Sequence, residues 1–237
     1  MTQPQQLPRI FFVQNLVLVP NAIPDNKITA LKEYQKRFST NTEAARVGSV
    51  PVELDKEGKK GNRKDIRSCE ISWIFPDAKF TQELTGMVNQ QIMNVAYQSY
   101  GFDVHRMEPL QYTHYTYHED NEVKDHYDWH TDSSLNTRPV PFDRKVSASI
   151  QLSDSDEYEG CDLEFPGFTK LLTQDGENEI GHDIQTMEPI NVKTVKTLLR
   201  QKGTAIFFPS MFHHRVTPIE SGERFALVVW LQGPKYR

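Results

Sequence analysis

The sequence predicts a mainly β protein with flanking helices, of the sandwich or barrel class. From residue 104 onward, short runs rich in β-branched and aromatic residues alternate with turn-forming clusters, as in all-β domains. In the first 103 residues, two segments repeat apolar residues at helical spacing instead. The chain has 237 residues and no stretch typical of an interdomain linker. We therefore expect a single domain, in which residues 1–103 support a β core over residues 104–232.

The first elements lie before and after a pair of prolines. Residues 10–19 (IFFVQNLVLV) predict one strand, or two short ones, that end at Pro20. After Pro24, residues 25–38 predict a helix with Asp25 or Asn26 as its N-cap. The apolar face of this helix would consist of Ile28, Leu31 and Tyr34.

A charged segment separates this helix from the next strand. Residues 54–67 contain glycine, asparagine and many charged residues, and we interpret them as a solvated mobile loop rather than a substrate clamp. Residues 69–75 (CEISWIF) alternate like a strand. Residues 80–100 predict a second helix with an apolar face. That face would consist of Leu84, Met87, Val88, Ile92 and Val95.

The second half of the chain predicts many short strands. The β-like runs are 110–117, 126–132, 145–153, 162–167, 190–196, 204–210, 213–219 and 224–232. Residues 168–199 form a long connection for a β domain, which suggests a lid or a surface hairpin. Together with the 54–67 and 118–126 loops, this connection is a candidate for selecting the substrate.

Composition excludes several classes of protein. Hydrophobic residues make up only 37 %, but aromatic residues reach 11 %, which a disordered chain would lack. The net charge of -5 argues against a general electrostatic affinity for nucleic acid. Two cysteines, Cys69 and Cys161, are too few for a disulfide framework and are expected to be reduced core thiols. With no apolar stretch of membrane-spanning length and no signal-like N-terminus, we expect a cytoplasmic protein that does not bind membranes.

A cluster of histidines and aspartates predicts a metal site. The stretch VKDHYDWHTDSS contains two His-x-Asp pairs, His126/Asp128 and His130/Asp132, and either pair could present both side chains on one face of a strand. A third ligand, His213 or His214, would complete two imidazoles and one carboxylate, the set that binds Fe(II) in oxygenases. Ten residues after His214 comes Arg224, which opens an apolar run. A buried arginine needs an anionic partner, and a carboxylate fits its fork.

These residues together resemble a known family. The pattern Tyr127-x-x-His130-x-Asp132, then His214-x-Val216-x-Pro218, Gly222 and Arg224, is similar to that of the iron- and 2-oxoglutarate-dependent dioxygenases. Within them it most resembles the prolyl 4-hydroxylase-like group of bacteria and phages. The similarity extends over roughly residues 100–232 and includes RKVSASIQLSDSDEYEGCDLEFPG and GTAIFFPS. The resemblance implies a double-stranded β-helix of the jelly-roll, cupin-like type.

The resemblance also selects among the histidines. The family pattern has an aromatic residue three positions before the metal histidine, as Tyr127 is for His130, and it places the distal histidine ten residues before the arginine. It therefore implies His130, Asp132 and His214 as metal ligands, with His126, Asp128 and His213 outside the ligand set. The remaining histidines, His105, His114, His118 and His182, match no motif and are interpreted as surface or hydrogen-bonded polar residues.

For the cosubstrate, the resemblance implies that Arg224 pairs with the 5-carboxylate of 2-oxoglutarate. Tyr117 resembles the family tyrosine that donates a hydrogen bond to this cosubstrate. Gln151 stands where relatives often have a tyrosine, and Trp230, six residues after Arg224, also matches the pattern. Leu163 and Val216 are expected to form walls of the pocket.

The implied activity is hydroxylation of an unactivated C–H bond, with a peptidyl proline as the favoured acceptor. It would require Fe(II), 2-oxoglutarate and O2, with ascorbate as reductant, and would convert 2-oxoglutarate to succinate and CO2. We expect a peptide or protein substrate in a bacterial or phage-infected cell. The sequence does not decide the oligomeric state.

Three other functions are weighed against this one. A nucleobase oxidative demethylase shares the chemistry, but its pattern has a second arginine six residues after the first, where this chain has Trp230. A small-molecule hydroxylase acting on a free amino acid would differ only in the loops around the site. A non-catalytic jelly-roll binding module would require the ordered set of His, Asp and Arg residues to be incidental.

Overall fold

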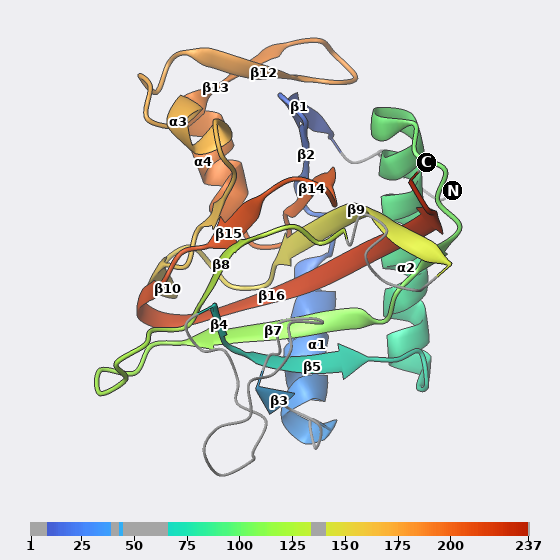
Figure 1. Ribbon diagram of the computed structural model, residues 1–237, viewed down its shortest axis with the longest axis vertical. Coiled ribbons are helices and arrows are strands. Elements are labelled where there is room, and N and C mark those ends of the chain that lie inside the picture. Colours follow the sequence, from blue (N-terminus) through green and yellow to red (C-terminus); the bar gives the residue numbers. More distant parts are fainter. Residues whose placement is uncertain (1–8, 39–42, 45–65, 134–140, 237) are drawn as a thin grey trace, which may run out of the picture.

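The computed structural model describes residues 9–38, 43–44, 66–133 and 141–236. It contains a large sheet and a small sheet, with helices outside (Figure 1). Every strand pair among the described residues is antiparallel, and the fold is mainly β, as predicted. Residues 54–65 of the predicted charged loop lie outside the described residues.

The larger sheet has twelve strands. Ten of them form a continuous path, and β6 (Arg106–Met107) and β10 (Tyr158–Gly160) both pair with β16. In order along this path, the strands are β13 (Pro189–Asn191), β12 (Glu179–Asp183), β1 (Phe11–Val13), β2 (Leu16–Val19), β14 (Ala205–Pro209), β9 (Phe142–Gln151), β16 (Ile219–Pro234), β7 (Leu110–Thr116), β5 (Glu70–Ile74) and β3 (Glu43–Ala44).

The smaller sheet has four short strands. In order they are β11 (Leu163–Glu164), β15 (His214–Val216), β8 (His126–His130) and β4 (Arg67–Ser68). The central pair, β15 and β8, places His214 opposite His130. Because these two strands come from distant parts of the chain, their pairing brings the two halves of the predicted metal motif together.

Strand β16 shows how the larger sheet separates core from site. Its odd-numbered residues Leu227, Val229 and Leu231 belong to the main hydrophobic core, whereas Ala226 and Val228 on the other face line a cavity. This alternation follows from the two-residue period of a strand. The sheet thus contributes one apolar face to the core and one face to the cavity.

Two long helices cover the core face. In Figure 1, the first lies behind β16, β7 and β5, and the second lies to the right, behind the ends of β9 and β16. Helix α1 (Asp25–Phe38) contributes Ile28 and Leu31, as its spacing predicted. Helix α2 (Lys79–Val95) continues into the π-helical turn η1 (Ala96–Tyr100), so the prediction of a helix over 80–100 is confirmed in extent. The chain leaves this turn at Gly101, whose φ of 61° is readily available to glycine.

The first predicted strand segment is two strands joined by a tight turn. β1 and β2 form a hairpin in which Gln14 has a φ of 54°. β2 pairs with β14, and β1 pairs with β12, so the N-terminal residues extend the larger sheet. The first part of the chain thus supplies strands as well as the covering helices.

The strand predicted over residues 190–196 is wrong for most of its length. Only β13 precedes the helix α4 (Val192–Arg200). The β-branched residues suggested a strand, but Val192, Val195 and Leu198 have helical spacing and are all buried. The Asn191 side chain also accepts a hydrogen bond from the Thr194 backbone N–H, which caps the helix start.

The long connection over residues 168–199 is an ordered extension of the fold. It contains α3 (Phe168–Leu171), the hairpin β12–β13 and α4 (Figure 1). Phe168, Ile190 and Val195 pack with β1, β2 and β14 in a second hydrophobic cluster. Within the described residues, no helix combines the length and apolar character needed to cross a membrane.

Candidate functional site

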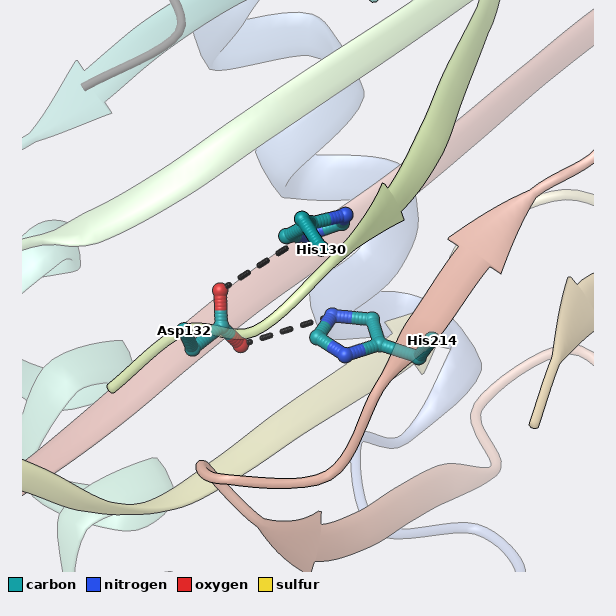
Figure 2. A group of neighbouring side chains, drawn as sticks. All are labelled: His130, Asp132 and His214. Carbon is teal, nitrogen blue, oxygen red and sulfur yellow. Dashed lines mark ion pairs between the residues drawn. The ribbon is translucent and has the colours of Figure 1, made fainter. Parts of the chain in front are cut away.

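His130, Asp132 and His214 point toward one another between the two sheets (Figure 2). His130 ends β8, Asp132 lies two residues beyond it, and His214 begins β15. Asp132 Oδ1 is 3.8 Å from His130 Nε2, and Asp132 Oδ2 is 3.6 Å from His214 Nε2. One ligand atom from each residue lies within 4.8 Å of the others. This constellation, which we call the triad, is the set that the sequence resemblance implied.

Backbone hydrogen bonds fix the orientation of both imidazoles. Nδ1 of His130 lies 2.7 Å from the carbonyl oxygen of Asp128, and Nδ1 of His214 lies 2.9 Å from that of Phe212. A carbonyl accepts only from a protonated ring nitrogen, so Nδ1 carries the hydrogen in each neutral ring. The Nε2 lone pairs then face the interior of the triad, as metal binding requires.

Contacts from the larger sheet and its ends hold Asp132 in place. Ser147 of β9 donates a hydrogen bond from Oγ to Asp132 Oδ2 at 2.6 Å. The backbone N–H groups of Asp132 and Ser133 both donate to the Ser210 carbonyl oxygen at 2.9 Å. The Ser147 and Ser210 hydroxyls are themselves 2.9 Å apart. The carboxylate is therefore oriented by the larger sheet, whereas both histidines come from the smaller one.

The environment favours the protonation states that bind a cation. Burial lowers the pKa of His130 to about 3, and the neighbouring His214 adds to this effect. Burial alone would raise the pKa of Asp132, but His214, His130 and Arg144 lower it to about 2. At neutral pH the triad thus offers a neutral His130 and an ionised Asp132. Two imidazoles and one carboxylate match the donor set preferred by Fe(II) in oxygenases.

A cavity extends from the triad along β16 to Arg224. Its lining includes the predicted residues Leu163, Val216 and Trp230. Arg224 is only 1 % exposed, and its Nε donates to Gln151 Oε1 at 3.1 Å. Gln151 thus contacts the arginine rather than the cavity directly.

Two buried donors along this cavity have no hydrogen-bond partner among the residues that the structure describes. They are Nη2 of Arg224 and Nε1 of Trp230. Leaving such groups unpaired in the interior is costly, so their presence beside a cavity indicates a polar ligand. A guanidinium with a free N–H suits a carboxylate, and the residues present therefore fit 2-oxoglutarate at this end.

The structure places Tyr117 outside the cavity lining. The Lys124 ammonium lies 4.2 Å from the centre of its ring. Tyr115, two residues earlier and within β7, lines the cavity instead, and its ring centre is 5.7 Å from the Arg224 guanidinium carbon. Strand periodicity made both tyrosines equivalent, and the long loop after residue 117 concealed which of them reaches the site.

The histidines and aspartate outside the ligand set lie away from the triad. Asp128 and His213 are exposed, and Nδ1 of His126 is 2.8 Å from the Lys124 carbonyl oxygen. His105 and His118 are exposed, His114 stacks on Phe225, and His182 packs near Phe12, so all four are surface or satisfied polar residues as predicted. Both cysteines are free and buried.

Two arginines that lie near the site were not predicted from the sequence to be there. Arg144 lies over Trp230, with its guanidinium carbon 3.7 Å from the ring centre, and pairs with Glu108 at 2.6 Å. Arg67 was assigned to the end of a solvated loop, but it is buried on β4 and lines the cavity. No sequence signal separated Arg67 from the charged residues before it.

Comparisons with known proteins agree with this geometry. The family model of the 2OG-Fe(II) oxygenase superfamily matches residues 102–232. A PKHD-type hydroxylase of Teredinibacter turnerae is 30 % identical over 108 residues, which are 45 % of this chain and 37 % of that protein. The chain thus aligns with well under half the length of this curated relative.

Solved structures share the fold at low identity. A Pseudomonas putida prolyl-4-hydroxylase superposes with a TM-score of 0.57 at 18 % identity, over 92 % of both chains. A prolyl hydroxylase of Trichoplax adhaerens, solved with a hypoxia inducible factor peptide fragment, gives a TM-score of 0.54 at 17 % identity, over 92 % of this chain and 83 % of that one. At these identities the likeness shows the jelly-roll fold.

Proposed function

Because the chain belongs to the 2OG-Fe(II) oxygenase superfamily, we propose that it hydroxylates an unactivated C–H bond of a peptidyl proline, using Fe(II), 2-oxoglutarate and O2. The observation that carries the chemistry is the triad at one end of a cavity and a buried, incompletely paired Arg224 at the other. The choice of proline rests on the prolyl hydroxylases and the PKHD-type hydroxylase that the chain resembles.

In this proposal, His130, Asp132 and His214 hold Fe(II). Arg224 pairs with the 5-carboxylate of 2-oxoglutarate, and Gln151 holds the guanidinium in position through its Nε. Tyr115 lies beside Arg224, and in this proposal it takes the role that the sequence resemblance gave to Tyr117. When bound, iron and cosubstrate supply the oxidation, converting 2-oxoglutarate and O2 to succinate and CO2 as the substrate is hydroxylated.

The chain's own residues supply orientation and exclusion of water. The backbone carbonyls of Asp128 and Phe212 keep both Nε2 atoms facing the triad. The hydrogen bond from Ser147 orients the Asp132 carboxylate. Leu163, Val216 and other apolar groups around the cavity keep it dry, which strengthens the pairing of Arg224 with a carboxylate. Ascorbate would keep the iron reduced between turnovers.

The test measures succinate formed from 2-oxoglutarate by the iron-loaded protein with ascorbate. Asp132→Ala removes a ligand of the triad and should lower turnover by more than about 100-fold, beyond the loss typical of residues that only support a metal ligand. Arg224→Ala should reduce turnover mainly by weakening 2-oxoglutarate binding. Full turnover in either folded variant would contradict the assignment.

The substrate is tested separately by mass spectrometry of host peptides incubated with the complete system. A product heavier by one oxygen atom, localised to proline, is expected. Modification of a free amino acid or removal of a methyl group from a nucleobase would assign the site to another substrate class. Absence of the visible charge-transfer band of iron-bound 2-oxoglutarate would indicate a binding module instead.

A further inference from the structure

Arg67 is a second buried arginine in the same cavity. It lies on β4, pairs in register with Tyr127 of β8, and is 7 % exposed. The cavity that it lines also contains the triad and Arg224. The proposed function gives Arg67 no role.

The partners of Arg67 are all neutral within the part of the chain that the structure describes. Its Nη2 donates to Gln111 Oε1 at 3.0 Å, and its Nε donates to Cys69 Sγ at 3.4 Å. Its guanidinium carbon lies 4.4 Å from the centre of the Tyr127 ring. Burial raises the pKa of the Cys69 thiol, so this group carries no compensating negative charge at neutral pH.

The absence of a carboxylate partner distinguishes Arg67 from other arginines near the smaller sheet. Arg144 pairs with Glu108 at 2.6 Å, and Arg215 pairs with Glu164 at 2.7 Å. Among the described residues, the groups that act most strongly on the Arg67 guanidinium are Cys69, Tyr115 and Tyr127, and none of them is a carboxylate. Because an uncompensated buried charge is costly, a cavity that exposes one to its interior is suited to an anionic ligand.

Strand register places Arg67 and Arg224 at different levels of the cavity. On β7, Tyr115 is opposite Arg224, whereas Gln111, which holds Arg67, is opposite Val228. Four residues of extended strand separate these levels by about 13 Å along the backbone. The Tyr127 ring beneath Arg67 stacks on the His130 ring, with centroids 3.5 Å apart. Arg67 therefore lies on the triad side of Arg224, and both arginines act electrostatically on Tyr115 between these levels.

We propose that Arg67 is a second carboxylate-binding residue, so that the cavity holds a linear dicarboxylate with one guanidinium for each end. This inference rests on the proposed function and deepens it, because both 2-oxoglutarate and its product succinate are such dianions. Arg224 would receive the distal carboxylate, and Arg67 the carboxylate at the triad end. The protein should therefore prefer dicarboxylates to monocarboxylates of equal length, and it should retain succinate.

The test compares succinate with butyrate, which has the same chain length and one carboxylate. Their affinities are measured by isothermal titration calorimetry on the full iron-loaded chain under anaerobic conditions. A charged hydrogen bond of ordinary strength implies that wild type binds succinate about 10- to 100-fold more tightly than butyrate. Arg67→Met should remove most of this preference, whereas Arg67→Lys should keep part of it.

Arg37→Met is the matched control, because it removes the same charge from an exposed position on α1. It should leave the preference for succinate unchanged. If Arg67→Met folds and retains the full preference, the proposal is overturned. Should that variant fail to fold, wild type is titrated with succinamate, in which an amide replaces one carboxylate. Binding of succinamate within threefold of succinate would also overturn the proposal.

This readout is independent of turnover. Loss of the succinate preference in Arg67→Met, in a protein that forms no succinate from 2-oxoglutarate, would retain the dicarboxylate site and reject the hydroxylase function. Normal turnover together with an unchanged preference for succinate in Arg67→Met would retain the hydroxylase function and reject the dicarboxylate site.

Discussion

The two sheets differ in what they contribute to the site. Strands β9 and β16 of the larger sheet are long and largely buried, and they pair from Ala226–Gln151 to Pro234–Phe142. Strands β8 and β15 of the smaller sheet are short, and every residue of β8 is at least partly exposed to solvent. Their pairing also shifts register between His214 and Val216. Yet the smaller sheet carries both histidines of the triad.

This difference indicates a division between scaffold and ligands. The larger sheet has the apolar contacts that determine the free energy of unfolding, and it presents Arg224 and Ser147 from rigid strands. The smaller sheet has little core of its own, so its histidines depend on backbone carbonyls and on the pairing of β8 with β15. If scaffold and ligands are separable in this way, a substitution on one side should leave the other side unchanged.

The largest expected effect on stability is in the larger sheet. Leu227 on β16 is fully buried in the core that faces α1 and α2. Leu227→Ala should lower the free energy of unfolding by about 2–5 kcal/mol through lost burial and the cavity that remains. Urea denaturation followed by circular dichroism measures this loss. At low temperature, where the variant remains folded, metal affinity should stay within about threefold of wild type, and a larger change would show that scaffold and ligands are not separable.

The next effect comes from the smaller sheet and depends on pH. In the folded, metal-free protein the pKa of His130 is about 3, compared with about 6.5 for an unfolded histidine. Between these values the unfolded chain binds a proton that the folded chain does not, so stability falls as pH decreases. From pH 7 to pH 5 the loss attributable to His130 is about 2 kcal/mol.

Urea denaturation of chelator-treated protein at both pH values measures this loss. His130→Gln should remove that part of the pH dependence, whereas replacement of the exposed His105 should not. An identical pH dependence in wild type and His130→Gln would show that His130 is not held neutral by its surroundings.

Sequence periodicity predicted the scaffold better than the small sheet. The alternation in β16 and the helical spacing in α1 and α2 are strong, because each element buries one continuous apolar face. The strand prediction for residues 190–196 was wrong for most of its length. Valine and threonine favour strands, but the capping Asn191 and the spacing of Val192 and Val195 favour a helix. Local propensity and tertiary packing disagreed there, and packing decided the outcome.

The triad could be predicted because the family pattern fixes its order and spacing. Strand periodicity alone left His126/Asp128 and His130/Asp132 equivalent. Residues that act through packing carry no comparable signature. Tyr115 could not be separated from Tyr117 by strand periodicity, and the burial of Arg67 depends on β4 pairing with β8, which no local pattern reveals.

A smaller effect should arise where the two sheets meet. Ser147 on β9 donates to Asp132, and this hydrogen bond joins a strand of the scaffold to a ligand of the triad. Ser147→Ala should weaken metal affinity about tenfold, at the low end of effects of ligand-orienting residues. Titration with Mn(II), followed by electron paramagnetic resonance, measures the affinity. Ser149→Ala, on the same face of β9, is the matched control, and an equal loss in both variants would show that the Ser147 hydrogen bond is not specific.

The smallest effect is expected on the outer face of β8. Trp129 neighbours His130 but points away from the triad, is 40 % exposed, and has the Arg215 guanidinium carbon 4.9 Å from its ring centre. Cation–π contacts at exposed positions contribute about 0.5–1 kcal/mol, so Trp129→Ala should lower the free energy of unfolding by no more than about 1 kcal/mol. A double-mutant cycle with Arg215→Ala isolates this contribution, because Arg215 also pairs with Glu164. Metal affinity should be unchanged, since backbone carbonyls rather than the outer side chains orient the histidine. A tenfold loss of metal affinity in Trp129→Ala would mean that the smaller sheet positions its ligand through packing on its outer face, contrary to the division between scaffold and ligands.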